Sequence, residues 1–567
     1  MLVEESVVKL LTLAARPGRV VLWVMFCAAS LSLASPPDSI PDSATPSGIP
    51  LARPCNKETA PAHSRIGRIE IDNQDIFDLK DSRENAWPYR LANHLHISTK
   101  RTIIQQQLLF KTGDGYDPRL LEESERILRS NHYFYDAKIV VLGCHEGTID
   151  VKVTTQDVWS LRPSASLSRS GGKNSGGFEI REVNLLGYGS SLNLSKKSGV
   201  DRDTVAIGYF DRHLLGTWNT LDLNYSRNSD GASKSFAFAR PFVALDSRWA
   251  AGVSALDDDR VESLYKRGES VDSFRHRQRY LQAFGGWSAG LVNGWTRRWS
   301  AGLTYDDHDF GPDSKSVAAN VIPEDRKFVY PFMRFDLIED KFETRRNYDQ
   351  IGRNEDFYLG TQVSVQLGYA STGLGSSENS VLYEVQAGNG FDLGRTQSLL
   401  LSAGVSGRLT GSASQNQLLS ASARYYWRQT ERNLWYVALQ GDMGHHLDID
   451  RQLLLGGDNG LRGYPLRFES GDKRVLVTLE HRYFSSWYPL RLFRVGGAVF
   501  FDAGRAWGAN HVGAQDQRWL SDVGFGLRLG STRSGLGNIS HIDVAYPLSR
   551  DSAIKRRQLI VETKRSF

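Results

Sequence analysis

The sequence predicts a mainly β protein: a transmembrane antiparallel β-barrel of about 16 strands, preceded by one small α/β domain. Three observations favour this class. Runs of about 10 residues alternate between apolar and polar side chains from about residue 156 onward, which is typical of membrane barrels. The leading segment resembles an export signal. The 567 residues include 53 Gly, 22 Tyr, 13 Trp and 25 Phe, a composition that suits tight turns and aromatic girdles.

Bulk composition narrows the function classes. Hydrophobic residues make up 40% of the chain, which argues against a helical membrane protein and is compatible with a barrel that has a polar lumen. The formal net charge is +5 and is spread along the chain without a long basic block, so nucleic acid is not expected as a partner. About 410 barrel residues at roughly 25 per strand and connection give the expected count of about 16 strands.

Residues 1–34 are predicted to be a signal peptide. Lys9, Arg16 and Arg19 precede an apolar run at 20–29, and Ser32 and Ala34 form a small-x-small cleavage site. A membrane anchor is the alternative, but this run is short for a membrane span.

Residues 35–64 are rich in Pro and Ser and predict a linker without a core. It contains Cys55, and Cys144 lies in the next domain. In an oxidising compartment the two could pair and fasten the linker to that domain, although spacing alone leaves this open.

Residues 65–155 are predicted to form the α/β domain, in the order β-α-α-β-β. A strand is expected at 66–71, short helices at 89–95 and 102–109, and a hairpin at 137–142 and 149–153. Between them, Asp117 is a good N-cap and Pro118 suits the first position of a helix that ends near Arg129.

Residues 156–567 are predicted to form the barrel, organised around the loop G-G-D-N-G-L-R-G-Y at 456–464. Two alternating strands follow the loop and place Glu480 and Asp502 on their less apolar faces. Carboxylates that face a confined lumen need a cation, and a guanidinium can meet a carboxylate in bidentate fashion. Arg462 is therefore predicted to pair with Glu480 and Asp502, and the polar stretches 257–277 and 371–380 are expected to be external loops.

These motifs resemble a known superfamily. Leu461, Arg462, Gly463 and Tyr464 are similar to the [VIL]-R-G-[FY] signature on the inward-folded loop of BamA/TamA-type assembly barrels and two-partner secretion transporters. T-L-E-H-R-Y at 478–483 and F-F-D-A-G-R-A-W at 500–507 resemble the strands that carry its acidic partners. N-L-L-G-Y-G at 184–189 is similar to an early barrel motif, and the terminal Phe567 resembles the barrel insertion signal.

The resemblance implies an inward-folded loop at 456–472 and identifies the 65–155 domain as similar to a POTRA domain in the periplasm. The implied localisation is the outer membrane. The implied activity is insertion or translocation of polypeptides without nucleotide hydrolysis, with polypeptide clients captured through the 65–155 domain. Outer-membrane lipid, lipopolysaccharide and periplasmic accessory proteins are further expected partners. Export of one dedicated secreted protein, and a plugged pore or lipid-handling barrel, stay open as alternatives.

The two sequence patterns that could indicate a catalytic or metal site have simpler explanations. A G-x-S-x-G occurs at 286–290, but no helix start follows, whereas a nucleophile elbow requires one. His445 and His446, with Asp448 and Asp450, are more simply polar loop residues than a metal cluster. The sequence therefore predicts no catalytic residue, no metal and no cofactor.

Overall fold

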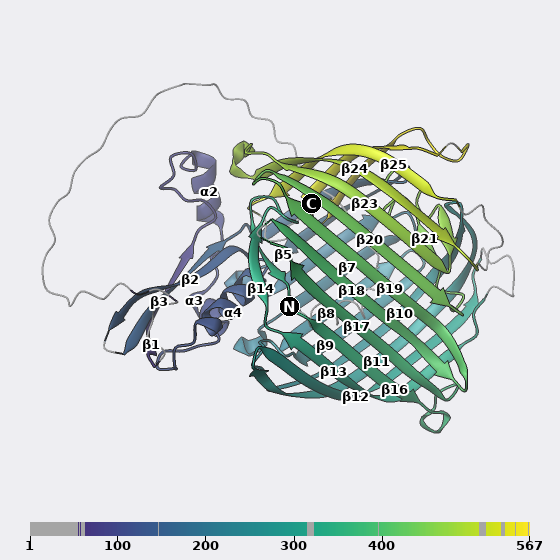
Figure 1. The fold of residues 1–567 in the computed structure, drawn as a ribbon, viewed down its shortest axis with the longest axis horizontal. Coiled ribbons are helices and arrows are strands. Elements are labelled where there is room, and N and C mark those ends of the chain that lie inside the picture. The colour runs from purple at the N-terminus through teal and green to yellow at the C-terminus, as the bar shows by residue number, and fades with distance from the viewer. Residues whose placement is uncertain are drawn as a thin grey trace, which may run out of the picture.

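The computed structural model describes residues 55, 57, 63–145, 147–314, 322–394, 396–509, 518–533, 539–549, 551–564 and 566. The predicted signal peptide at 1–34, most of the linker and the terminal Phe567 lie outside this range. The described chain forms an N-terminal α/β unit that lies against one end of a large barrel (Figure 1). None of its helices is long and apolar enough to cross a membrane.

The N-terminal unit is a three-stranded sheet covered by helices. Its elements are β1 (Arg65–Gln74), α2 (Trp87–Leu95), α3 (Arg101–Gln106), α4 (Pro118–Arg129), β2 (Phe134–His145) and β3 (Thr148–Asp157). The sheet order is β1-β3-β2, with β1 parallel and β2 antiparallel to β3. The predicted order of elements is present, and the assignment of this unit as a POTRA domain stays a prediction.

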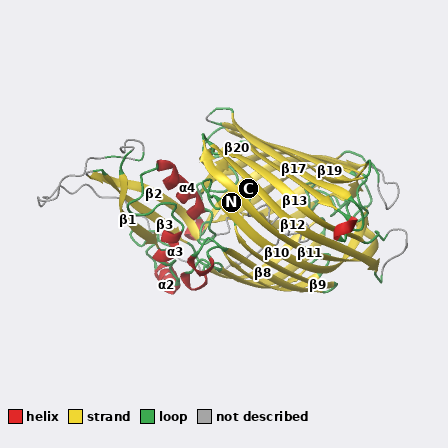
Figure 2. Cartoon of the chain, turned by 90° about the horizontal axis from the view of Figure 1, so that it is seen from below, coloured by secondary structure: helices red, strands yellow, loops and turns green. Residues whose placement is uncertain are grey.

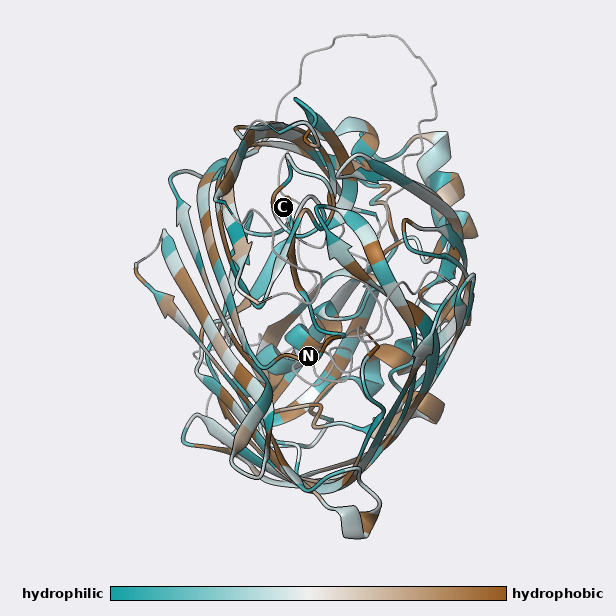
Figure 3. Cartoon of the chain, turned by 90° about the vertical axis from the view of Figure 1, so that its right-hand side faces the viewer, coloured by the Kyte–Doolittle hydropathy of each residue, from teal (hydrophilic) through white to brown (hydrophobic). Residues whose placement is uncertain are grey.

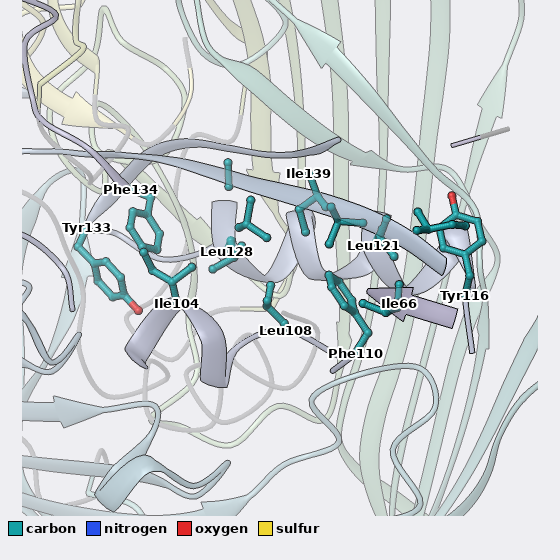
Figure 4. Close-up of a cluster of buried hydrophobic side chains, with 14 of the residues drawn as sticks. Ile66, Ile104, Leu108, Phe110, Tyr116, Leu121, Leu128, Tyr133, Phe134 and Ile139 are labelled. Atoms are coloured by element: carbon teal, nitrogen blue, oxygen red, sulfur yellow. The ribbon is translucent and has the colours of Figure 1, made fainter. Parts of the chain in front are cut away.

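Helix α4 begins where the sequence predicts. The side chain of Asp117 accepts a hydrogen bond from Arg119 N, and Pro118 occupies the first turn. Leu121 and Leu128 point from α4 into the core, where they meet Ile104, Phe134 and Ile139 (Figure 4). Outside this core, Cys55 and Cys144 form a disulfide that joins the end of the linker to the end of β2.

The barrel is closed and contains twenty strands among the described residues, so the expected count of about 16 is wrong. The strands are β4 (Leu161–Ser170), β5 (Lys173–Glu182), β6 (Ser191–Ser198), β7 (Asp203–Asp211), β8 (Thr220–Asn228), β9 (Gly231–Arg240), β10 (Trp249–Lys266), β11 (Glu269–Val292), β12 (Trp295–Pro312), β13 (Arg326–Glu339), β16 (Gln362–Ala370), β17 (Ser380–Asp392), β18 (Gln397–Thr410), β19 (Ala413–Arg428), β20 (Asn433–His445), β23 (Lys473–Phe484), β24 (Phe493–Trp507), β25 (Leu520–Ser531), β26 (Ile539–Pro547) and β27 (Gln558–Lys564).

The error has a simple cause. Six short strands, β4 to β9, fit within residues 161–240 because tight turns join them. The estimate of roughly 25 residues per strand is far too generous there. Two of these turns carry the 3₁₀ segments η1 (Leu185–Gly187) and η2 (Leu214–Gly216), and η5 (Pro489–Arg491) lies in a similar turn between β23 and β24. These turns lie at the barrel end that faces the N-terminal unit, which we call the near end.

Residues 257–277 were expected to be an external loop and are instead part of a tall hairpin, β10–β11, closed by a turn at Arg267 and Gly268. The polar side chains are accommodated by cross-strand ion pairs, such as Asp257 with Arg277 and Asp259 with Arg275. The stretch 371–380 is a connection, as expected, and includes η4 (Thr372–Leu374).

The alternation of side chains separates two environments in the barrel wall. Val499, Phe525 and Leu527 are exposed on the outer surface, whereas Asp502 and Arg528 are fully buried inside. Figure 3 looks into the barrel from the end opposite the N-terminal unit and shows chain segments that cross its interior.

One further hairpin lies at the near end and is not part of the barrel wall. It consists of β14 (Phe342–Arg346) and β15 (Asn354–Tyr358), inserted between β13 and β16. Arg129 on α4 forms a bidentate ion pair with Asp356 on β15, at 2.7 and 2.9 Å. This hairpin therefore connects the N-terminal unit to the mouth of the barrel, and β14 lies beside α4 in Figure 1.

Candidate functional site: a charged loop anchor beside a weak seam

The loop singled out by the sequence folds back into the barrel. It is held between β21 (Leu453–Leu455) and β22 (Glu469–Gly471), which pair as a short antiparallel ladder. Asn459 stabilises the turn from within, because its side chain accepts a hydrogen bond from Gly456 N and donates one to Leu454 O. The side chain of Arg462 then enters a buried cluster of charges.

Arg462 lies between Asp502 and Glu480. Its Nε and Nη2 atoms donate to the two carboxylate oxygens of Asp502 at 2.7 and 3.0 Å, and Nη1 donates to Glu480 Oε2 at 3.0 Å. The guanidinium also lies 3.3 Å from the centroid of the Phe500 ring. The structure thus brings together the three charged residues that the sequence grouped, and all three are buried.

The neighbours of Arg462 in the signature fix the loop by different means. Leu461 and Tyr464 are fully buried in an apolar cluster with Leu455, Phe468, Leu476, Ala506 and Leu520. Tyr464 also donates a hydrogen bond to Ser521 O at 2.8 Å. Gly463 N donates to Asp522 Oδ2 at 3.0 Å, and a Cβ atom at Gly463 would lie 2.7 Å from Asp522 Cβ. This close approach requires glycine.

Sequence reasoning missed four members of the charge cluster. Arg482 donates to Glu480 Oε1 at 2.9 Å, Arg528 pairs with Asp543, and Asp522 lies directly opposite Asp502 on the neighbouring strand. All four lie on the lumen face that alternation predicts for β23, β25 and β26. The alternation of inward and outward positions was the available signal, but it does not reveal which residues meet across the lumen.

The cluster extends from the loop to the near end of the barrel. Arg482 Nη1 donates to Tyr348 O at 2.7 Å and to Asp349 Oδ1 at 3.2 Å, and both acceptors lie at the tip of the β14–β15 hairpin. The same hairpin holds Arg129 of the N-terminal unit through Asp356. A continuous series of contacts therefore runs from α4 through the hairpin to the loop.

Glu355, on the same hairpin, has an unusual titration. Burial, reinforced by the nearby Asp349 carboxylate, raises the pKa of Glu355 to about 8. Backbone N–H groups of Tyr348 and Asp349 donate to Glu355 and oppose this shift. The charge of the hairpin tip therefore changes in the mildly alkaline range.

The barrel closes at a weak seam between its first and last strands. Among the residues that the structure describes, one pair of opposed residues, Arg169 on β4 and Val561 on β27, joins these two strands. By contrast, β26 and β27 pair from Ile539↔Lys564 to Ala545↔Gln558, and β4 and β5 pair along their full lengths. Each lost pair removes backbone hydrogen bonds, so among the described residues this is the interface in the wall with the least backbone pairing.

The signature loop lies beside this seam. Ser170, the last residue of β4, donates a hydrogen bond through Oγ to Gly457 O of the loop at 2.6 Å. In the same loop, Arg462 binds Glu480 on β23 and Asp502 on β24. The loop therefore connects the wall on both sides of the seam.

The motif at 184–189 lies in the turn between β5 and β6, at the near end. The side chain of Asn184 accepts a hydrogen bond from Gly189 N at 2.8 Å and donates one to Thr99 Oγ1 of the N-terminal unit at 2.8 Å. It thus joins the first barrel hairpin to the N-terminal unit.

The other chemical candidates are explained by structure. Ser288 of the G-x-S-x-G lies buried within β11, where its Oγ accepts a hydrogen bond from Gly290 N next to a register shift. Asp448 binds Arg408, and Asp450 binds Arg326. Among the described residues, no group of three or more His, Cys, Asp and Glu could hold a metal ion.

No family model matches the chain. A Treponema pallidum (strain Nichols) protein named "Putative outer membrane protein assembly factor" is 21% identical over 187 residues, which are 31% of this chain and 22% of that relative. The chain thus matches less than a quarter of the relative's length.

Two solved structures are similar to this chain at low identity. BamA from Haemophilus ducreyi, lacking POTRA domains 1–3, is 13% identical, with 88% of this chain and 85% of that chain covered and a TM-score of 0.38. CdiB from Escherichia coli is 14% identical, with coverage of 88% and 76% and a TM-score of 0.45.

Proposed function

We propose that this chain inserts or translocates polypeptides at the outer membrane of a bacterium, without nucleotide hydrolysis. The observation that carries the proposal is the seam between β4 and β27, where one pair of opposed residues in the described part of the chain closes a wall that is otherwise continuously paired. A polypeptide strand can satisfy the exposed backbone groups of such an edge by adding to it.

The arrangement of the N-terminal unit supports delivery to this seam. Strand β3 ends at Asp157, and β4 begins at Leu161, so the unit is joined directly to one of the two seam strands. In the three-stranded sheet, β1 is an edge strand, and backbone groups of residues 113–116 cover its first part. We propose that the rest of this edge captures clients before they reach the seam.

The charge cluster has a structural role in this proposal. The carboxylates of Glu480 and Asp502 are neutralised by guanidinium groups, and Thr478 Oγ1 donates a further hydrogen bond to Asp502. We propose that Arg462 fixes the loop while the seam opens and closes, so that the wall keeps its register. Such a role requires no catalysis and no cofactor.

Site-specific photo-crosslinking in living cells tests the proposal. The crosslinker replaces Leu167, which is exposed on seam strand β4, or Glu70 on the β1 edge. The matched control is Leu367, another exposed leucine, on β16. Adducts of unfolded outer-membrane polypeptides at 167 and 70, and none at 367, would support the proposal.

Other outcomes identify the alternatives. Adducts of a single secreted species would indicate a dedicated exporter. An absence of polypeptide adducts at 167 and 70, with the barrel correctly inserted, would contradict the proposal and favour a plugged pore or a lipid-handling barrel.

A further inference from the structure

Helix α2 of the N-terminal unit has an apolar face that nothing in the described structure covers. Trp87 is 68% exposed, Leu91 39% and Leu95 60%. At about 100° per residue, these three side chains lie within about 80° of the helix circumference. Ile97, which follows the helix, is exposed as well. We call Trp87, Leu91 and Leu95 the α2 stripe.

The opposite face of α2 is firmly bound, so the stripe has a defined direction. Asn93 accepts a hydrogen bond from Phe77 N and donates one to Phe77 O, at 3.0 and 2.8 Å. The Tyr89 ring packs against the Phe77 ring with centroids 4.6 Å apart. Both residues lie about 120–240° around the helix from the residues of the stripe. The stripe therefore faces away from the N-terminal unit.

The bound face of α2 is fastened to the rim of the barrel. Tyr89 Oη donates to Leu490 O, in the turn between β23 and β24, at 3.1 Å. Arg533, in the turn after β25, forms an ion pair with Glu84 and lies 4.6 Å from the Phe77 ring centroid. Figures 1 and 2 both place α2 at the margin of the near end, away from its centre.

The barrel turn to which α2 is fastened also exposes apolar side chains. On β23, Leu479 and Tyr483 are exposed outward, and Trp487 and Leu490 of the following turn are 64% and 63% exposed. Because Tyr89 of α2 donates to Leu490 O, the helix that carries the stripe is fastened beside this exposed apolar turn. Arg90 is exposed at the side of the stripe, where it suits an anionic headgroup.

We propose that α2 lies in the leaflet interface beneath the barrel rim, with its stripe in contact with phospholipid acyl chains. A short amphipathic helix with Trp and Leu on one face and a basic flank has the chemistry of an interfacial anchor. This inference rests on the proposed insertion of the barrel in a membrane. The helix would hold the N-terminal unit against the leaflet next to strands β23–β26, close to the seam.

Fluorescence quenching by lipid distinguishes this proposal from the others. Single cysteines replace Leu91 in the stripe, Leu142 on β2 and Leu439 on the outer barrel wall, which are all exposed leucines. Cys27 is replaced by serine, and the Cys55–Cys144 disulfide is left intact by labelling without reductant. Each labelled full chain is placed in phosphatidylethanolamine–phosphatidylglycerol vesicles that contain nitroxide-labelled acyl chains.

The expected result is strong quenching at Leu439→Cys, at least about half of that quenching at Leu91→Cys, and little quenching at Leu142→Cys. Quenching at Leu439→Cys without quenching at Leu91→Cys would overturn the lipid contact and leave the barrel in its membrane. Protection of Leu91→Cys by an added unfolded polypeptide, in place of lipid quenching, would overturn it as well and assign the stripe to a client. An unquenched Leu439→Cys would contradict both this inference and the membrane insertion on which it rests.

Discussion

Replacing Arg462 with alanine is the most informative perturbation of the lumen. The change removes three hydrogen bonds to two buried carboxylates and the contact with the Phe500 ring. Breaking a buried ion pair by removing one partner costs about 3–5 kcal/mol, mostly because the remaining charge is left uncompensated. We expect this cost to fall on the closed state of the loop.

Arg462→Ala leaves the carboxylates of Glu480 and Asp502 with different numbers of remaining partners. Glu480 keeps Arg482 at 2.9 Å and has Arg528 at 3.7 Å. Asp502 keeps a hydrogen bond from Thr478 at 2.9 Å but loses its bidentate guanidinium, and it lies opposite Asp522. Most of the cost should therefore arise at Asp502. Adding Asp502→Asn to Arg462→Ala should restore more stability than adding Glu480→Gln.

The assay is the labelling rate of a buried thiol on the loop. Ser470 on β22 is 1% exposed, and cysteine is close to it in size. Since about 1.4 kcal/mol corresponds to a factor of ten, Arg462→Ala should raise labelling of Ser470→Cys by roughly 10²- to 10³-fold. The control is Arg334→Ala, which breaks the partly exposed pair with Asp336 and should cost about 1 kcal/mol or less.

Two results would refute this reasoning. An unchanged labelling rate in Arg462→Ala would show that the ion pairs do not hold the loop. Equal rescue by Asp502→Asn and Glu480→Gln would show that the loss is not concentrated at Asp502.

Two further predictions concern the hairpin β14–β15. Because the folded pKa of Glu355, about 8, lies above its ordinary value, the stability it contributes is complete below that ordinary value and is lost as pH rises through about 8. Trypsin is itself more active at pH 9 than at pH 6, so the measure is the ratio of the two cleavage rates within residues 345–353. This ratio should be larger in the parent than in Glu355→Gln, and equal ratios in the two proteins would contradict the assignment. Arg129→Ala should cost about 2–4 kcal/mol at the contact with Asp356 and slow disulfide formation between Asp136→Cys and Asn354→Cys, whose native side chains are 3.0 Å apart, whereas Arg68→Ala, at an exposed pair, should not. Equal rates in Arg129→Ala and the parent would show that the pair does not hold the unit to the barrel.

Much of the fold could be predicted from local periodicity and from the residues that begin and end its elements. Alternation on β23, β24 and β25 correctly separated outward from inward residues, because one face of each strand meets a different environment. Asp117 and Pro118 correctly located the start of α4, since capping depends on neighbouring residues alone. The strand count failed because it depends on turn lengths, which the alternating pattern does not report.

The extent of the charge cluster could not be predicted, because it depends on contacts between distant residues. Arg482 lies on a predicted lumen face. Its acceptors Tyr348 and Asp349 are more than 130 residues away in the sequence, on a hairpin that is not part of the barrel wall. A stretch rich in charged residues was assigned wrongly for the same reason. Residues 257–277 have the composition of a loop, yet cross-strand pairs between Asp and Arg maintain a regular hairpin.

The central claim is that the seam between β4 and β27 must open for the protein to act. Arg169 and Val561 lie directly opposite each other, so cysteines at both positions are placed to form a disulfide across the seam. A matched lock between Ala545→Cys and Gln558→Cys joins β26 to β27, away from the seam. The account predicts that cells which depend on the seam-locked protein stop accumulating folded outer-membrane clients until reductant is added, while the matched lock has no effect. Normal client accumulation with the seam fully oxidised would contradict it.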